Sequence, residues 1–166
     1  MRMFVLLGSN IQPRAHLARA VAELREAFEV VAESPVYRTA PVGDSDQDDF
    51  WNLAVEIDSE LRPPEVQARL RAIERQLGRR RDPARPSGPR TADLDLVLVP
   101  GVEGRFDRLE LPSPLLLREA FVAVPLADLA PQLPHPVTGV PLRSIAAETV
   151  ASATRPPRRV AGGLAP

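Results

Sequence analysis

The sequence predicts an α+β fold in which an antiparallel-type sheet carries helices on one face and a candidate site on the other. The first observation is the order of periodic segments up to Val99, which is strand, helix, strand, strand, helix, loop, strand. The second is that two of these strands alternate apolar and polar residues, which gathers polar side chains on the face away from the helices. This order and patterning are typical of the ferredoxin-like split βαβ sandwich.

The first half of the pattern begins with a buried strand over residues 4–7 that runs into Gly8. A glycine there permits either a tight turn or the close approach of a ligand to the backbone. Pro13 suits the first turn of a helix, and the spacing predicts a helix over residues 13–27. Its apolar stripe consists of Leu17, Val21, Leu24 and Phe28. A second strand follows over residues 30–37.

An acidic loop over residues 44–49 leads into a third strand, residues 50–57. Alternation places Trp51, Leu53, Val55 and Ile57 on its core face. Phe50 and Asn52 fall on the opposite face, where a ring and an amide could bind a flat heterocycle or simply be surface residues. A second helix begins at Pro63 and ends at Gly78.

An arginine-rich loop and two aspartates follow this helix and form the strongest functional signal. Five arginines lie on a loop that three prolines keep from forming helix, namely Arg79, Arg80, Arg81, Arg85 and Arg90. In the strand that follows, Leu94, Leu96 and Leu98 share the core face, whereas Asp93 and Asp95 share the other. Two carboxylates about 6.6 Å apart can reach one magnesium ion or a pair of them.

Arginine and metal together indicate a polyphosphate site. Guanidinium groups bind phosphate oxygens in pairs and stay charged. The chain has neither a Walker-type loop nor a lysine, so phosphate binding must rely on arginine and metal. The alternatives are an aspartate pair that only forms salt bridges and an arginine loop that is only a solvated surface; their adjacency favours the functional interpretation.

The rest of the chain gives weaker signals. We expect residues 105–111 to form a short hairpin and residues 115–129 to form one or two short helices or turns that cover the open face of the sheet. Phe121 would then either face the site or pack in the core. His16 and His135 have no partner spacing and are expected at the surface. We expect a single domain over residues 1–150 and a disordered tail over residues 151–166.

Composition excludes several function classes. The chain has 166 residues, a formal charge of -1 and 44% hydrophobic residues, so no general attraction to nucleic acid or to an anionic membrane is expected. Its apolar runs are too short for a signal peptide or a membrane span. The absence of cysteine suits a cytoplasmic protein.

Four segments resemble the 6-hydroxymethyl-7,8-dihydropterin pyrophosphokinases, a family of folate-pathway enzymes. They are Leu7-Gly8-Ser9-Asn10, Tyr37-Arg38-Thr39-Ala40-Pro41, Phe50-Trp51-Asn52 and Gly88-Pro89-Arg90-Thr91-Ala92-Asp93-Leu94-Asp95. The resemblance implies that the chain transfers pyrophosphate from Mg-ATP to the hydroxymethyl group of the pterin and releases AMP. It also implies that ATP and the pterin are its partners, and we expect a monomer.

The same resemblance implies a role for each candidate residue. Asp93 and Asp95 would hold two Mg²⁺ ions, while Arg79 and Arg90 would neutralise the phosphoryl groups. The residues implied for nucleotide binding are Glu74, Arg81 and Arg85. The residues implied for pterin binding are Thr39, Pro41, Val42, Phe50, Asn52 and Phe121. The loops at 43–49 and 79–88 would close over the substrates.

The chain departs from the family pattern at three places. Pro86-Ser87 replaces a basic and a bulky residue before Gly88, Ser113 replaces a histidine, and Glu119 replaces an arginine. An alternative is therefore a non-catalytic paralogue that binds pterin or nucleotide. A third interpretation, an RNA-binding module of the same fold, is disfavoured because the sheet lacks stacked aromatics and the aspartates repel phosphates.

Overall fold

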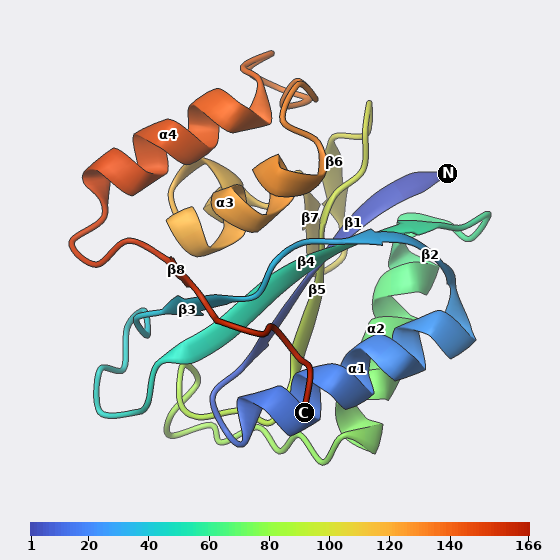
Figure 1. Cartoon of the computed structure of the whole chain (residues 1–166). Helices are drawn as coiled ribbons and strands as arrows, with labels where there is room; N and C mark the ends of the chain where they lie inside the picture. Colours follow the sequence, from blue (N-terminus) through green and yellow to red (C-terminus); the bar gives the residue numbers. More distant parts are fainter.

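The computed structural model describes all residues, 1–166, and has three layers, with helices on both sides of one sheet (Figure 1). The sheet is antiparallel, in the order β5-β1-β4-β3-β8, and β2 also pairs with β4. Its strands are β1 (Arg2–Ser9), β2 (Glu29–Glu33), β3 (Tyr37–Thr39), β4 (Phe50–Asp58), β5 (Asp93–Leu98) and β8 (Arg158–Arg159). The predicted ferredoxin-like α+β class is confirmed.

Helices α1 (Pro13–Ala27) and α2 (Pro63–Gln76) cover one face of the sheet, as predicted. Both begin at a proline, which suits a first turn whose N–H groups have no helical partner. The backbone N–H of Arg62 donates to the Glu65 carboxylate over 2.9 Å and closes the start of α2. Gly78, with a φ of 79°, ends it. The arginine loop therefore starts at a fixed point.

The opposite face is covered by more structure than the sequence pattern indicated. The predicted hairpin is β6 (Gly104–Phe106) and β7 (Leu109–Leu111), and the predicted short helices are η1 (Pro114–Leu117) and α3 (Ala120–Leu129). A further helix, α4 (Leu142–Ser152), packs against α3 and was not predicted. η1, α3 and α4 bury a second core cluster against Phe4, Leu6 and Ala54, whereas Leu109 and Leu111 of the hairpin join the main core cluster. Only one end of this sheet face stays open.

A bulge in β5 corrects the predicted pattern of that strand. Phe4 pairs with Leu98 and Val5 with Leu96, so Val97 is an extra residue in the ladder. Leu94 and Leu96 pack beneath α1 and α2 as expected, but Leu98 joins Val97 in the second core, towards α3 and α4. The prediction for Leu98 is wrong because the bulge shifts the alternation by one residue.

The predicted second strand is divided in two. β2 and β3 both pair with β4, and Ser34-Pro35 separates them, because proline has no N–H to give to the ladder. In place of that bond, the Ser34 hydroxyl accepts from the Ala54 N–H over 2.9 Å. The break brings Thr39 alongside the start of β4.

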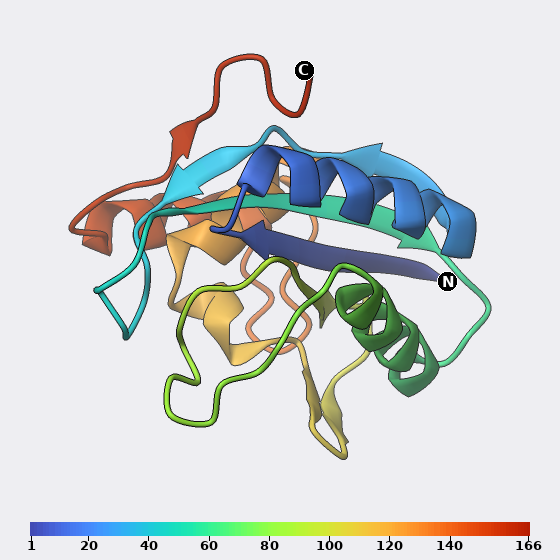
Figure 2. The ribbon, with the colours of Figure 1, turned by 90° about the horizontal axis from the view of Figure 1, so that it is seen from below.

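The end of the chain carries more regular structure than its composition indicated. The domain boundary expected at residue 150 lies within α4, and residues 158–159 of the expected tail form β8. β8 pairs with β3, the Val160 N–H donates to the Val36 carbonyl, and Val160 and Leu164 pack against the main core. Figure 2 shows this segment running along the β3 edge. His135 is buried, with 3% of its surface exposed, rather than at the surface.

None of the helices has the length and apolar character needed to cross a membrane.

Candidate active site

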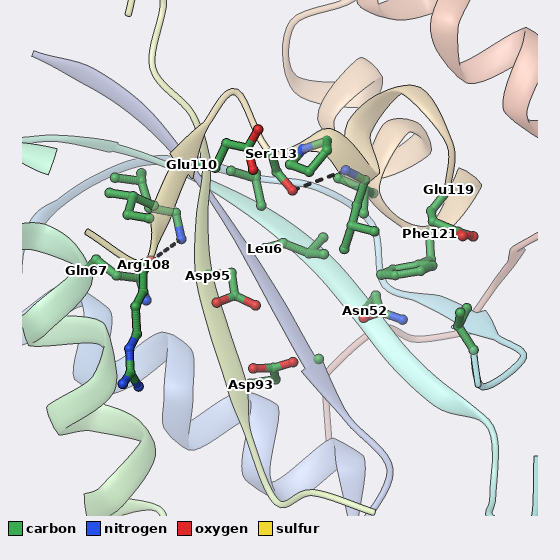
Figure 3. Close-up of a pocket in the computed structure, with 18 of the residues that line it drawn as sticks. Leu6, Asn52, Gln67, Asp93, Asp95, Arg108, Glu110, Ser113, Glu119 and Phe121 are labelled. Carbon is green, nitrogen blue, oxygen red and sulfur yellow. Dashed lines mark hydrogen bonds between the residues drawn. The ribbon is translucent and has the colours of Figure 1, made fainter. Parts of the chain in front are cut away.

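The open end of the second sheet face forms a cavity of about 950 Å³ between β1, β4 and β5 on its floor and the β6–β7 hairpin, η1 and α3 on its walls (Figure 3). Residues predicted from separate parts of the sequence line it together. They are Thr39, Val42, Phe50, Asn52, Arg81, Arg90, Asp93, Asp95 and Phe121. Pro41, Glu74, Arg79 and Arg85 do not line this cavity.

Asp93 and Asp95 point from β5 into the same space, as the alternation predicted. Their positions are set by the pairing of β5 with β1, in which Gly8 lies opposite Asp93 and Leu6 lies opposite Asp95. The side chains are 22% and 42% exposed, respectively. The cavity floor thus presents two carboxylates at different depths.

Two arginines of the loop hold Asp93 by both oxygens. Arg79 contacts Oδ1, and the Arg90 Nη1 donates to Oδ2 over 2.7 Å. Burial alone would raise the pKa of Asp93, but the charges and hydrogen bonds of Arg79 and Arg90 outweigh it and lower that pKa. Asp93 is therefore ionised, and its partner Arg79 is only 8% exposed.

Asp95 is held by an arginine that the sequence did not single out. Arg71 on α2 donates from Nη2 to Asp95 Oδ1 over 3.0 Å and from Nη1 to Glu74 Oε1 over 2.7 Å. Burial, followed by the neighbouring charge of Asp93, raises the pKa of Asp95 to about 7. The available signal was its position three residues before Glu74, on the same face of α2.

Glu74, implied as a nucleotide ligand, acts here as a support. Its side chain is 3% exposed, accepts the Leu94 N–H over 2.9 Å, and binds Arg79 over 2.8 Å. Gln67, about two turns earlier on α2, accepts the Leu96 N–H over 2.9 Å. Both side chains satisfy backbone donors on the free edge of β5, which fixes the strand that carries the aspartates.

The carboxylate pair fits magnesium bound together with phosphates. The structure contains no group of three or more His, Cys, Asp or Glu side chains arranged to hold a metal ion. Magnesium commonly takes one or two protein carboxylates and completes its shell with water and substrate phosphates. The donor set of Asp93 and Asp95 matches that habit, whereas a site made only of protein ligands would need more donors.

The side of the cavity assigned to the pterin is built around Asn52. Its Nδ2 donates to Thr39 Oγ1 over 2.6 Å, and the residue is buried. Phe121 points over Asn52 into the cavity, and Phe50 lies on the same face of β4. Arg90 also stacks on the Phe50 ring, with 5.3 Å between the guanidinium carbon and the ring centroid. Arg90 therefore connects the aromatic side to the carboxylates.

The acidic loop and the arginine loop are linked to each other. Arg85 Nε donates to Asp44 Oδ2 over 2.7 Å, and Gln47 Nε2 donates to the Ser87 carbonyl over 2.7 Å. Asn10 Nδ2 donates to Gln47 Oε1, and its Oδ1 accepts the Arg90 N–H. Arg85 thus pairs with a carboxylate of the other loop, and Asn10, not predicted as a site residue, ties both loops to β1.

Two of the three departures from the family pattern, Ser113 and Glu119, lie on the hairpin side of the cavity. Arg108, Glu110, Ser113 and Glu119 all line the cavity. Ser113 accepts the Leu115 N–H over 3.3 Å and so caps η1, a local role that a hydroxyl suits. Arg108 has no carboxylate partner, which leaves its charge available on the cavity wall. Neither Arg108 nor Glu110 was predicted as a site residue, because no pattern in the sequence links the hairpin to the strands of the floor.

Comparison with known proteins identifies one family. The family model for 7,8-dihydro-6-hydroxymethylpterin-pyrophosphokinase (HPPK) matches residues 4–131. A 2-amino-4-hydroxy-6-hydroxymethyldihydropteridine pyrophosphokinase of Methylorubrum extorquens is 45% identical over 135 residues, covering 80% of this chain and 84% of the relative. The Bacillus subtilis protein of the same name is 40% identical over 138 residues, covering 81% of each.

Solved structures share the fold. A Plasmodium falciparum HPPK-DHPS with pteroate superposes with a TM-score of 0.69 over 90% of this chain, at 12% sequence identity. The chain spans 43% of that structure's chain. This likeness supports the fold assignment alone.

Proposed function

Because the chain belongs to the 7,8-dihydro-6-hydroxymethylpterin-pyrophosphokinase family, we propose that it transfers pyrophosphate from ATP to the hydroxymethyl group of 6-hydroxymethyl-7,8-dihydropterin and releases AMP, in folate biosynthesis. One observation carries the proposal beyond family membership. The aspartate pair, two of the loop arginines, Arg81 and Arg90, and the Asn52–Phe121 side line one cavity, although they come from distant parts of the sequence.

Each residue has a part in this reaction. Asn52 orients the pterin edge, Phe50 and Phe121 enclose the ring, and Thr39, Pro41 and Val42 supply contacts beside it. Attack by the hydroxymethyl oxygen on the β-phosphorus then requires an aligned pair of substrates and little covalent chemistry from the protein. The floor between Asp93 and Asn52 carries only Gly8, so both substrates can approach the backbone there.

Charge at the triphosphate is offset by the arginines and by metal. Asp93 and Asp95 would hold Mg²⁺, two ions in our proposal, which supplies charge neutralisation at the phosphates when bound. Arg90 and Arg79 stabilise the charge that develops on transfer, and Arg81 and Arg85 contribute to nucleotide binding. The linked loops 43–49 and 79–88 close and exclude water. We further propose a monomer that works in the cytoplasm, where ATP is available.

The direct test is to incubate the purified chain with Mg-ATP and the pterin and to quantify AMP and ADP. Pterin-dependent AMP is the expected product. A chain that binds the pterin but forms no AMP would instead support the non-catalytic alternative prompted by Ser113 and Glu119. Light scattering on a sizing column checks the monomer.

Replacing the metal-holding carboxylates should abolish this activity. We expect Asp93→Asn and Asp95→Asn each to lower AMP formation by about 100-fold or more, the scale for losing one electrostatic group at a reacting centre. Glu148→Gln, an exposed position on α4 outside the cavity, is the control. Full activity of Asp95→Asn in magnesium would contradict the metal assignment.

A further inference from the structure

The unassigned arginine on α2 joins three carboxylates. Arg71 lies 2.7 Å from Glu74 Oε1, 3.0 Å from Asp95 Oδ1 and 3.9 Å from Asp93 Oδ1. Its side chain is 35% exposed and lines the cavity. The positive charge of the guanidinium therefore offsets the negative charge of the carboxylate pair.

A cation at the same carboxylates would compete with Arg71. Arg71 is the only hydrogen-bond donor to the Asp95 carboxylate, whereas Asp93 is already held by Arg79 and Arg90. A metal ion bound to Asp95 would share or take Oδ1 and would repel a guanidinium a few ångströms away. Arginine cannot lose its proton to relieve this repulsion, so the side chain must find another anionic partner.

Phosphate oxygens of a nucleotide are such a partner. Arg71 and Gln67 line the cavity from α2, and Arg81 and Arg108 line the same cavity. A guanidinium binds phosphate as readily as carboxylate. We propose that Arg71 makes cation binding at Asp95 depend on nucleotide: it competes with the cation until phosphates accept it. This inference rests on the proposed function, and the coupling must act equally in both directions.

The test is Mn²⁺ binding, followed by the electron paramagnetic resonance signal of the free ion, with and without α,β-methylene-ATP. In this analogue a methylene group bridges the α- and β-phosphorus and is not cleaved, so no pyrophosphate is transferred. The variants are Arg71→Gln and, as a matched control, Arg75→Gln. Arg75 lies one turn later on α2, is exposed and forms no ion pair. Both variants remove one positive charge from the same helix.

We expect Arg71→Gln to bind Mn²⁺ without nucleotide about fivefold or more tightly than the native protein, and the nucleotide-induced gain in Mn²⁺ affinity to shrink by a similar factor. Arg75→Gln should match the native protein. If Arg71→Gln behaves like Arg75→Gln in both conditions, the proposal is wrong.

Two further variants separate the possible failures. Asp95→Asn should lose Mn²⁺ binding in the presence of nucleotide; if it does not, the metal site of the proposed function fails rather than the role of Arg71. If Arg71→Gln does not fold, as judged by circular dichroism, the same Mn²⁺ titration is carried out on Arg71→Lys. A lysine ammonium lacks the fork that contacts Glu74 and Asp95 together, so Mn²⁺ affinity without nucleotide should still rise, and an unchanged affinity would overturn the proposal.

Discussion

Gly8 shows how a single missing side chain shapes the cavity. Gly8 lies on β1, where it pairs with Asn52 of β4 on one side and with Asp93 of β5 on the other. A Cβ at Gly8 would lie 2.7 Å from Asn52 Oδ1 and 4.0 Å from the Phe50 ring. Its backbone is ordinary strand, so the requirement is one of space. Of the two roles considered for this glycine, the turn is excluded because Gly8 lies inside β1, and the close approach of a ligand stays a prediction.

We therefore predict that Gly8→Ala weakens pterin binding by about tenfold or more and ATP binding much less. The added methyl group must displace Asn52, which Thr39 holds, and such overpacking costs about 1–3 kcal/mol. Titration of both ligands by calorimetry measures the difference.

Gly101→Ala is the matched control for that experiment. Gly101 has a φ of 73°, and a Cβ added there would meet no atom within 4 Å, so alanine at this position adds backbone strain far from Asn52. It should lower stability without a selective loss of pterin affinity. Equal losses of both ligands in Gly8→Ala would contradict the role assigned to Gly8.

At the scale of elements, periodicity predicted the first half of the fold well because its strands and helices each bury one face. It placed Asp93, Asp95, Phe50 and Asn52 on one side of the sheet. It could not predict the orientation of Leu98, because a bulge leaves no mark in a run of apolar residues. Nor could it predict which α2 side chains reach the β5 edge.

The segment after α3 was the weakest part of the prediction, and His135 explains part of it. The Nδ1 atom of His135 accepts the N–H groups of Val137 and Thr138, both over 3.2 Å. The imidazole thereby organises the turn before α4, a role that a sequence without partner spacing does not reveal. Burial lowers the pKa of His135, and the neutral ring is the form that accepts both bonds.

This contact predicts a pH dependence of stability. The pKa of His135 is lower in the folded chain than its ordinary value of 6.5, so the unfolded chain takes up the proton first. The contribution is complete above pH 6.5 and is lost as the pH falls from there towards the folded-state pKa. His135→Asn keeps a side-chain acceptor without a titrating group. It should reduce the drop in unfolding free energy between pH 7.5 and 5.5, measured by urea denaturation.

His16→Asn, which replaces the other histidine of the chain in the same way, is the control for the substitution itself. If His135→Asn and the native protein lose stability in parallel over this range, the turn does not depend on the neutral imidazole.

At the scale of the whole molecule, the last residues connect the far edge of the sheet to the loop that precedes Phe50. Arg155 donates to Asp49 Oδ2 over 2.8 Å, where Arg38 of β3 also binds over 3.0 Å. Farther along the chain, Arg14 of α1 donates to the Gly163 carbonyl over 2.8 Å.

Composition alone suggested disorder for residues 151–166 because the segment is short, basic and rich in proline and glycine. Its order comes from the β3 edge and the core surface, which exist only in the folded chain.

Removing residues 154–166 should therefore destabilise the molecule and loosen the entrance to the cavity. The deletion uncovers the β3 edge and the surface under Val160 and Leu164, so we expect the melting temperature to fall, by about 2–4 °C for each kcal/mol of stability lost in a chain of this size. Hydrogen exchange should become faster at residues 43–49, because Asp49 loses one of the two arginines that bind its carboxylate.

Arg155→Gln should reproduce the faster exchange with little loss of melting temperature. Arg158→Gln, an exposed tail position without a side-chain hydrogen-bond partner, should change neither. Faster exchange in the deletion but not in Arg155→Gln would assign the restraint to strand pairing instead of the Asp49 ion pair.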